Sequence, residues 1–359
     1  MIDEKILKTE ERAVFALRQL YRQYGYLPYK MSKFEEFEYY IRNKDFLISD
    51  RFITFNDIGG KLLALKPDVT LSIVKSREAA PGCKEKVYYN ENIYRAHRST
   101  HQYQEIMQTG LECMGDIDLY DIYEAVTLAA QSLGLISQDF ILQISHLGIL
   151  AAALDRVSKD DAFRQKAIAF IAEKNAHDLS RLCQEYGVDS TLLTGFVSTY
   201  GDRKTVITKL EALCPGQALE ELKALSALLD NAPYADKIIF DFSVVGNMHY
   251  YNGIVFKGYL SGISDALLSG GQYDKLMEKL GRTGGAIGFA LYLDLLEQLP
   301  TPSRGYDVDV LLLYDDPSAV PKVVNRLRAE GKTVSAQKNI PQRLRYKQVL
   351  DLRKEAAVC

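Results

Sequence analysis

The chain has 359 residues, 47% of them hydrophobic and 25% charged, a composition typical of a folded protein with a sizeable core. Its 44 Lys and Arg against 47 Asp and Glu leave no basic excess to hold a nucleic-acid backbone. Five irregularly spaced cysteines argue against a disulfide framework or zinc motif, and no run of about 18 apolar residues predicts a membrane span. The charged N-terminus predicts no signal peptide, so we expect a cytoplasmic protein.

The first half of the sequence predicts one helix followed by an antiparallel sheet. Residues 5–24 have apolar side chains at helical spacing, and Gly25 follows as a left-handed cap. Between residues 52 and 87, short apolar runs broken by Asn, Asp and Gly predict a hairpin. Alternating segments at 86–96 and 104–115 continue the sheet, and a helix at about 117–133 and a strand before His146 follow.

The second half predicts a helical insertion within the same sheet. Residues 148 to about 231 show helical periods, for example Leu219, Leu222, Leu225 and Leu229, and few strand signals. The strand pattern returns at IIFDFSVV and ends in a glycine-rich strand that enters a helix, GGAIGFALYLDLLEQL. We therefore predict a core domain over residues 1–300, with the insertion at about 148–231.

Residues 301–359 are predicted to form a linker and a short α/β segment. TPSRG (301–305) has linker composition, and the remainder fits a β-α-β-α order with a last helix at the C-terminus. From Ser303 onward the chain has 11 basic and 7 acidic residues, which makes this segment mildly basic. Its basic run QRLRYK (342–347), placed on a helix, is interpreted as a solvated face.

Polar and aromatic residues in four blocks could together bind a free amino acid. Such a ligand needs acceptors for its ammonium, a cation or backbone donors for its carboxylate, and partners for its side chain. The blocks LKPDVTLSIVKS, YRAHRSTHQYQEIMQTGLECMG, MHYYNGIVF and SGGQYDKL with AIGFALYLDLL supply these groups. For each residue taken alone, structural roles remain open: Asp68 as a helix cap, Glu112 as a paired strand residue and the tyrosines as core packing.

In order and spacing these blocks resemble the catalytic core of class II histidyl-tRNA synthetases. They resemble more closely the truncated paralogue of those enzymes, the regulatory subunit family of ATP phosphoribosyltransferase. The resemblance covers about residues 5–300 and implies an α+β fold with an antiparallel sheet flanked by helices. The segment after the linker resembles the first half of an anticodon-binding domain.

The resemblance also implies a histidine site. Asp68 and Thr70 match residues that hold the amino group, and Gln108 and Glu112 match side chains that contact the amino acid. The site residues implied in this way are Asp68, Thr70, Arg95, Gln108, Glu112, Tyr250 and Tyr251. Among them, Arg95 matches an arginine that contacts the carboxylate or the adenylate phosphate, and the two tyrosines match a pair that receives the imidazole. A surface ion pair is the structural alternative for Arg95.

Departures from the synthetase pattern predict that ATP activation is lost. Cations stabilise the charged phosphate in amino-acid adenylation, and losing one typically costs about 100-fold or more in rate. Gly246 and Leu295 stand where the synthetases have arginines, and no arginine lies between Arg203 and Arg282 to substitute for the first. His97 replaces an acidic residue of the adenine site.

Two further positions bear on assembly and on metal binding. Ser32 replaces a proline in the family's dimerisation element, although Phe34 and Glu35 stay in register, so a homodimer is still expected. His97 and His101 would form a metal-binding pair only on a helix, and the loop that carries them is not expected to be one. We predict no metal and no cofactor.

The leading hypothesis is a non-catalytic regulatory subunit that senses histidine and assembles with the short-form catalytic subunit of ATP phosphoribosyltransferase. This enzyme performs the first step of histidine biosynthesis, and the resemblance alone implies the partner. The alternatives are a divergent histidyl-tRNA synthetase and an RNA-binding module of synthetase descent. The charge balance disfavours the RNA-binding module, and we expect no nucleic-acid or membrane partner.

Overall fold

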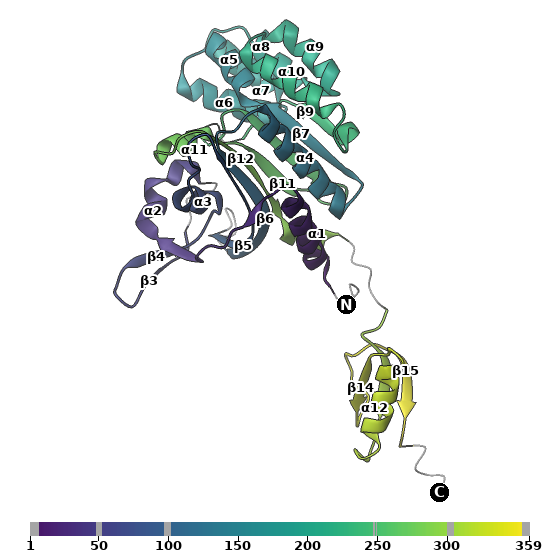
Figure 1. Cartoon of the computed structure of the whole chain (residues 1–359). Coiled ribbons are helices and arrows are strands. Elements are labelled where there is room, and N and C mark those ends of the chain that lie inside the picture. The colour runs from purple at the N-terminus through teal and green to yellow at the C-terminus, as the bar shows by residue number, and fades with distance from the viewer. Residues whose placement is uncertain are drawn as a thin grey trace. The chain divides into compact units, whose positions relative to one another are not determined.

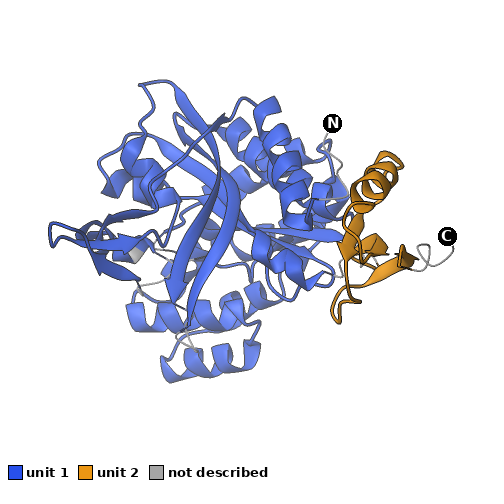
Figure 2. Ribbon diagram, turned by 90° about the horizontal axis from the view of Figure 1, so that it is seen from below, with its two compact units in different colours: residues 1–299 blue, residues 300–359 orange. Residues whose placement is uncertain are grey.

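The computed structural model describes residues 7–47, 52–96, 102–246, 248, 250–299 and 305–353. The chain divides into two compact units, Met1–Leu299 and Pro300–Cys359, which are coloured separately in Figure 2. Most of the predicted linker at 301–305 lies outside the described residues. Of the helices that are described, none is long and apolar enough to cross a membrane.

A nine-stranded sheet is the centre of the first unit. Its inner strands pair antiparallel from β5 through β6, β12, β11 and β10 to β7, while β1 on β5 and β9 on β7 pair in parallel. The strands lie in the order β1 (Leu27–Pro28), β5 (Lys84–Ala96), β6 (Tyr103–Gly115), β12 (Gly285–Tyr292), β11 (Leu268–Gln272), β10 (Ile254–Leu260), β7 (Phe140–His146), β9 (Ile238–Asp241) and β8 (Tyr200–Gly201). This mixed but mainly antiparallel sheet confirms the predicted α+β class.

The two faces of the sheet are covered differently. Helices α1 (Thr9–Gln23) and α4 (Leu119–Ile136) lie along one face, where the main hydrophobic core includes Leu111, Phe256 and Ile287 (Figure 1). Helix α1 ends before Gly25, whose φ of 81° is the left-handed conformation that the sequence predicted. The smaller elements α2 (Phe37–Arg42) and α3 (Thr70–Ser76) lie on the other face.

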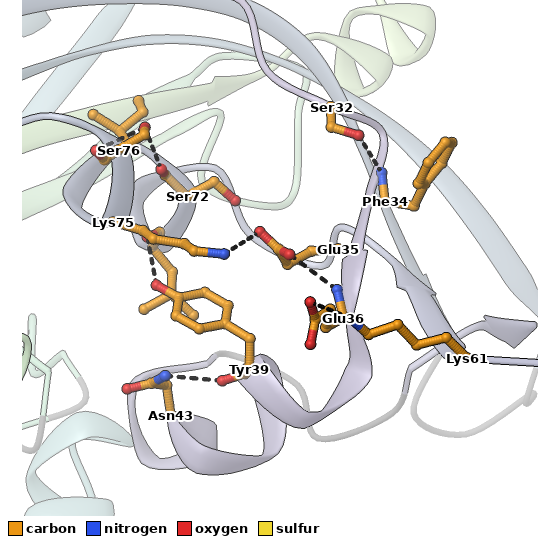
Figure 3. A network of polar contacts seen from close by, with 12 residues as sticks. Ser32, Phe34, Glu35, Glu36, Tyr39, Asn43, Lys61, Ser72, Lys75 and Ser76 are labelled. Atoms are coloured by element: carbon orange, nitrogen blue, oxygen red, sulfur yellow. Dashed lines mark hydrogen bonds and ion pairs between the residues drawn. The ribbon is translucent and has the colours of Figure 1, made fainter. Parts of the chain in front are cut away.

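A three-stranded sheet carries the predicted hairpin beside this second face. Strands β3 (Thr54–Asn56) and β2 (Phe34–Glu36) both pair antiparallel with β4 (Leu62–Leu65). Lys75 on α3 donates a hydrogen bond to the Glu35 carboxylate on β2 and lies 4.4 Å from the centre of the Tyr39 ring (Figure 3). The Tyr39 hydroxyl donates in turn to the Leu71 carbonyl at 3.1 Å. These contacts fasten β2 and α2 to α3.

Residues 147–229 are mainly helical, in the region where the sequence predicted an insertion. Their helices are α5 (Leu147–Val157), α6 (Asp161–Ala172), α7 (Ala176–Glu185), α8 (Thr191–Val197), α9 (Arg203–Leu213) and α10 (Gln217–Leu229). The apolar faces of these helices are continuous with the main core, because the predicted leucines 219, 222, 225 and 229 are all buried there. The chain then returns to the sheet through the 3-10 turn η3 (Ala235–Lys237) and β9.

Of the two helices predicted near the end of the chain, the first is present and the second is wrong. After β12 the chain enters a helix as predicted, which is the 3-10 helix η4 (Leu293–Gln298), and the short α11 (Asp274–Lys279) precedes β12. In the second unit, β13 (Val308–Leu313), α12 (Val320–Ala329) and β14 (Val334–Gln337) are followed by a strand, β15 (Tyr346–Asp351), where a helix was predicted. The segment is extended because β15 pairs in parallel with the apolar β13.

Candidate amino-acid-binding site

The sheet's second face forms the floor of a cavity of about 300 Å³. Successive residues of a strand point to opposite faces, so Gln108 and Glu112 on β6 share this face while Leu111 points into the core. Gly288 and Ala290 on the neighbouring β12 also line the cavity. Because Gly288 has no side chain and Ala290 has only a methyl group, the middle of the floor stays open. A central strand of the sheet can therefore border a space large enough for a ligand.

Glu112 lies at the centre of the floor and is almost fully buried. The Thr70 hydroxyl donates to Glu112 Oε1 at 2.7 Å, and the Tyr273 hydroxyl donates to Oε2 at 2.6 Å. Burial nevertheless raises the pKa of Glu112 to about 8, and the nearby Asp68 carboxylate adds to this increase. A cationic group placed here would favour the ionised carboxylate and lower that pKa.

Asp68 lies at the start of α3 and faces Arg95 on β5. One carboxylate oxygen accepts the Leu71 backbone N–H at 2.9 Å, and the other is 4.0 Å from Arg95 Nη2. Burial raises the pKa of Asp68, although the N–H donors and the guanidinium oppose the increase. Arg95 Nε also donates to the Pro67 carbonyl at 2.8 Å. Asp68 therefore accepts an N–H group of the first turn of α3 from the position before the N-cap residue Val69, and it also lines the cavity.

Tyr250 and Tyr251 form an aromatic wall. Their ring centres are 4.5 Å apart and their planes meet at 72°, an edge-to-face arrangement. Tyr250 also packs against Tyr273, with ring centres 5.6 Å apart. Gly246 also lines the cavity, and a Cβ added there would lie 2.7 Å from Cδ2 of Tyr251. The Tyr251 ring thus occupies the space beside residue 246.

The structure brings all seven sequence-predicted residues to this one cavity: Asp68, Thr70, Arg95, Gln108, Glu112, Tyr250 and Tyr251. Sequence reasoning missed five polar residues that also line it, namely Tyr89, Lys257, Ser269, Tyr273 and Tyr292. Tyr273 follows the glycine pair of SGGQYDKL, a block that was recognised without assigning this residue a role. Ser269 and Tyr292 likewise stand in quoted blocks, SGGQYDKL and AIGFALYLDLL, whereas Tyr89 and Lys257 could be found only from strand register.

The two positions of the missing cations differ in their surroundings. Gly246 is at the cavity, whereas Leu295 lies on η4 and packs against the main hydrophobic core. His97 and His101 lie outside the described residues, and the described part of the chain contains no group of three potential metal ligands. Neither Gly246 nor Leu295 presents a charge to a bound nucleotide.

Comparisons with known proteins identify the family and the fold. The sequence model of the family described as Histidyl-tRNA synthetase matches residues 2–296. A Clostridium acetobutylicum protein named ATP phosphoribosyltransferase regulatory subunit is 29% identical over 356 residues, covering 92% of this chain and 86% of the relative.

Two solved structures share the fold. A Bacillus halodurans structure, described as an ATP phosphoribosyltransferase regulatory subunit/histidyl-tRNA synthetase, is 24% identical with a TM-score of 0.79, covering 98% of this chain and 96% of that one. A chain in the ATP phosphoribosyl transferase (HisG:HisZ) complex of Thermotoga maritima is 20% identical with a TM-score of 0.64, covering 79% and 97%. With the family match spanning most of its length, the chain belongs to the histidyl-tRNA synthetase family, in which curated relatives are ATP phosphoribosyltransferase regulatory subunits.

Proposed function

We propose that this protein is a non-catalytic regulatory subunit of ATP phosphoribosyltransferase that binds histidine in the cavity on the sheet. It would act in the cytoplasm with a short-form catalytic subunit, in the first step of histidine biosynthesis. The observation that carries the proposal is one cavity that gathers all seven implied histidine-site residues while Gly246 and Leu295 supply no cation. The names of the curated relatives support the choice of enzyme.

The cavity suits the separate groups of histidine. The buried carboxylates of Asp68 and Glu112 can accept hydrogen bonds from an ammonium group, which would offset the cost of their own burial. The rings of Tyr250 and Tyr251 offer an aromatic surface and two hydroxyls to an imidazole. Gln108, buried on β6, adds an amide to the floor.

Adenylation has little support in the same cavity. Each missing phosphate-binding cation would typically cost about 3 kcal/mol of transition-state stabilisation. At Gly246, a longer side chain would also have to displace the Tyr251 ring. We therefore infer that the protein binds an amino acid without activating it.

Regulation requires that histidine favour one arrangement of the assembly. By linkage, histidine affinity would change by the same factor when the catalytic subunit binds.

The contacts of Lys75 with β2 and α2 attach the helix that carries Thr70 to the small sheet (Figure 3). That sheet exposes an aromatic pair, Phe34 and Phe55, with ring centres 5.8 Å apart. We propose this apolar surface for the homodimer contact.

The proposal is tested by mixing the full chain with a short-form catalytic subunit and measuring phosphoribosyl transfer with and without histidine. We expect activity above that of the catalytic subunit alone, and inhibition by histidine that requires this chain. An unchanged rate in the mixture would remove the regulatory assignment.

A divergent histidyl-tRNA synthetase is the second candidate, because the matching family model bears that description. It predicts exchange of pyrophosphate into ATP in the presence of histidine. We expect no exchange above background at high protein concentration, and clear exchange would establish the synthetase activity instead.

A further inference from the structure

Lys257 is a cation in the cavity wall to which the resemblance gives no role. It lies on β10, is half-buried and lines the cavity. Within the described ranges, no hydrogen bond or ion pair engages its ammonium group. Partial burial removes hydration from a charge, and a half-buried lysine without a protein partner lacks the usual compensation. A bound anion would supply this compensation.

Arg95, the other cation among the described lining residues, already has partners within the protein. Arg95 donates to the Pro67 carbonyl and lies 4.0 Å from the Asp68 carboxylate. Asp68 and Glu112 are the two acidic groups among the described lining residues. The ammonium group of a zwitterionic ligand therefore finds acceptors at Asp68 and Glu112. For the negatively charged group of the same ligand, the Lys257 ammonium offers donors that are free.

Strand register places Lys257 at the opposite side of the floor from Glu112. Lys257 pairs with Ser269 on β11, Ser269 pairs with Ala290 on β12, and Ala290 pairs with Gly110 on β6. Three strand spacings, about 14 Å between backbones, thus separate β10 from the strand that carries Glu112. Side chains from both edges line the same cavity, and the small residue Ala290 lies between them.

We propose that Lys257 binds the negatively charged group of the cavity's ligand, which is the α-carboxylate of an amino acid. This inference rests on the proposed function for the identity of the amino acid, histidine. It assigns to β10 the positive charge that the chain lacks at Gly246. Ser269, which is the neighbour of Lys257 across the strand pair and also lines the cavity, places a hydroxyl donor beside it.

The test is calorimetric titration of the full chain with L-histidine and with histidinol, which has a hydroxymethyl group in place of the carboxylate. Lys257→Met should weaken L-histidine about 10- to 100-fold, because a hydrogen bond to a charged group is lost, and should change histidinol less than about twofold. Lys257→Arg should keep most of the L-histidine affinity. Lys279→Met is the matched control, since Lys279 is exposed and does not line the cavity.

The outcomes separate this inference from the proposed function. If the wild-type chain binds L-histidine and Lys257→Met weakens both ligands equally or neither, the role of Lys257 is overturned while the histidine site stands. If the wild-type chain binds neither ligand, the histidine site fails and the role of Lys257 fails with it. A loss confined to L-histidine, absent in the Lys279→Met control, supports the inference.

Discussion

The two faces of the nine-stranded sheet show how one set of strands serves two purposes. On β6, Leu111 is fully buried in the apolar core under α1 and α4, whereas the next residue, Glu112, is buried among hydroxyls on the opposite face. On β12, Ile287 is buried in the core while Gly288 and Ala290 leave the cavity open. The alternation of the strands therefore separates a packed face from a hollow one.

This difference indicates where stability and binding come from. A packed apolar face contributes free energy of folding, and it fixes the strands that hold costly buried carboxylates on the other face. Substitutions on the packed face should change the free energy of unfolding, and those on the hollow face should change ligand affinity. If substitutions on the packed face changed both the free energy of unfolding and the ligand affinity, the two faces would not have separate purposes.

The largest effect is expected for Leu111→Ala on the packed face. Removing a fully buried leucine leaves a cavity and typically lowers the free energy of unfolding by about 2–5 kcal/mol. Urea denaturation followed by circular dichroism measures this change. Histidine affinity of the folded variant should stay within about twofold of the wild type, and a large loss of affinity would show that the faces are not independent.

On the hollow face, Gly288→Ala should remove binding, and it should also lower the free energy of unfolding because the new Cβ would lie 2.5 Å from the Leu111 carbonyl oxygen. A Cβ at residue 288 would overlap Oε2 of Glu112, so the carboxylate must move from its place between Thr70 and Tyr273. We expect histidine affinity measured by calorimetry to fall about 100-fold. Gly216→Ala is the control, since a Cβ at residue 216 meets nothing within 4 Å. Equal affinity in both variants would contradict the placement of Glu112.

Glu112 should also give the unliganded protein a distinct pH dependence. Its pKa is raised by burial from 4.5 to about 8, so the folded state binds the proton more tightly than the unfolded state. The stability that this proton contributes is complete below pH 4.5 and is lost as the pH rises through about 8. Glu112→Gln should therefore gain in melting temperature relative to the wild type between pH 6 and 9. A constant difference across that range would refute the raised pKa.

The smallest effect is expected for Tyr250→Phe, which keeps the ring and removes one hydroxyl. The aromatic packing against Tyr251 and Tyr273 should survive, so the free energy of unfolding should change little. Histidine binding should weaken by about 1 kcal/mol through one lost hydrogen bond. Tyr120→Phe, on the exposed start of α4, provides the control. Unchanged affinity in Tyr250→Phe would place the imidazole elsewhere.

Prediction from sequence succeeded where local pattern decides structure. The alternation in β5 and β6 and the helical periods near Leu219 reflect side chains that face one core. The predicted C-terminal helix is wrong because β15 depends on pairing with β13, some 40 residues earlier in the chain.

The candidate site shows the same limit. Family motifs located Asp68 and Glu112, whose contribution to the cavity follows from the order of the blocks. Lys257 and Gly288 lie on strands whose neighbours are fixed only by the order and register of the folded sheet. Their roles depend on which side chains stand opposite them, and this information is not local in the sequence.

The central claim, that histidine acts through the cavity on the sheet, is tested most directly by Asp68→Ala in the mixed assay of phosphoribosyl transfer. Asp68 lines the cavity and is nearly buried, so its loss should act on ligand binding more than on assembly. We predict that Asp68→Ala stimulates the catalytic subunit as the wild type does, but needs about 10-fold or more histidine for half-inhibition. An unchanged histidine response in this variant would contradict the account.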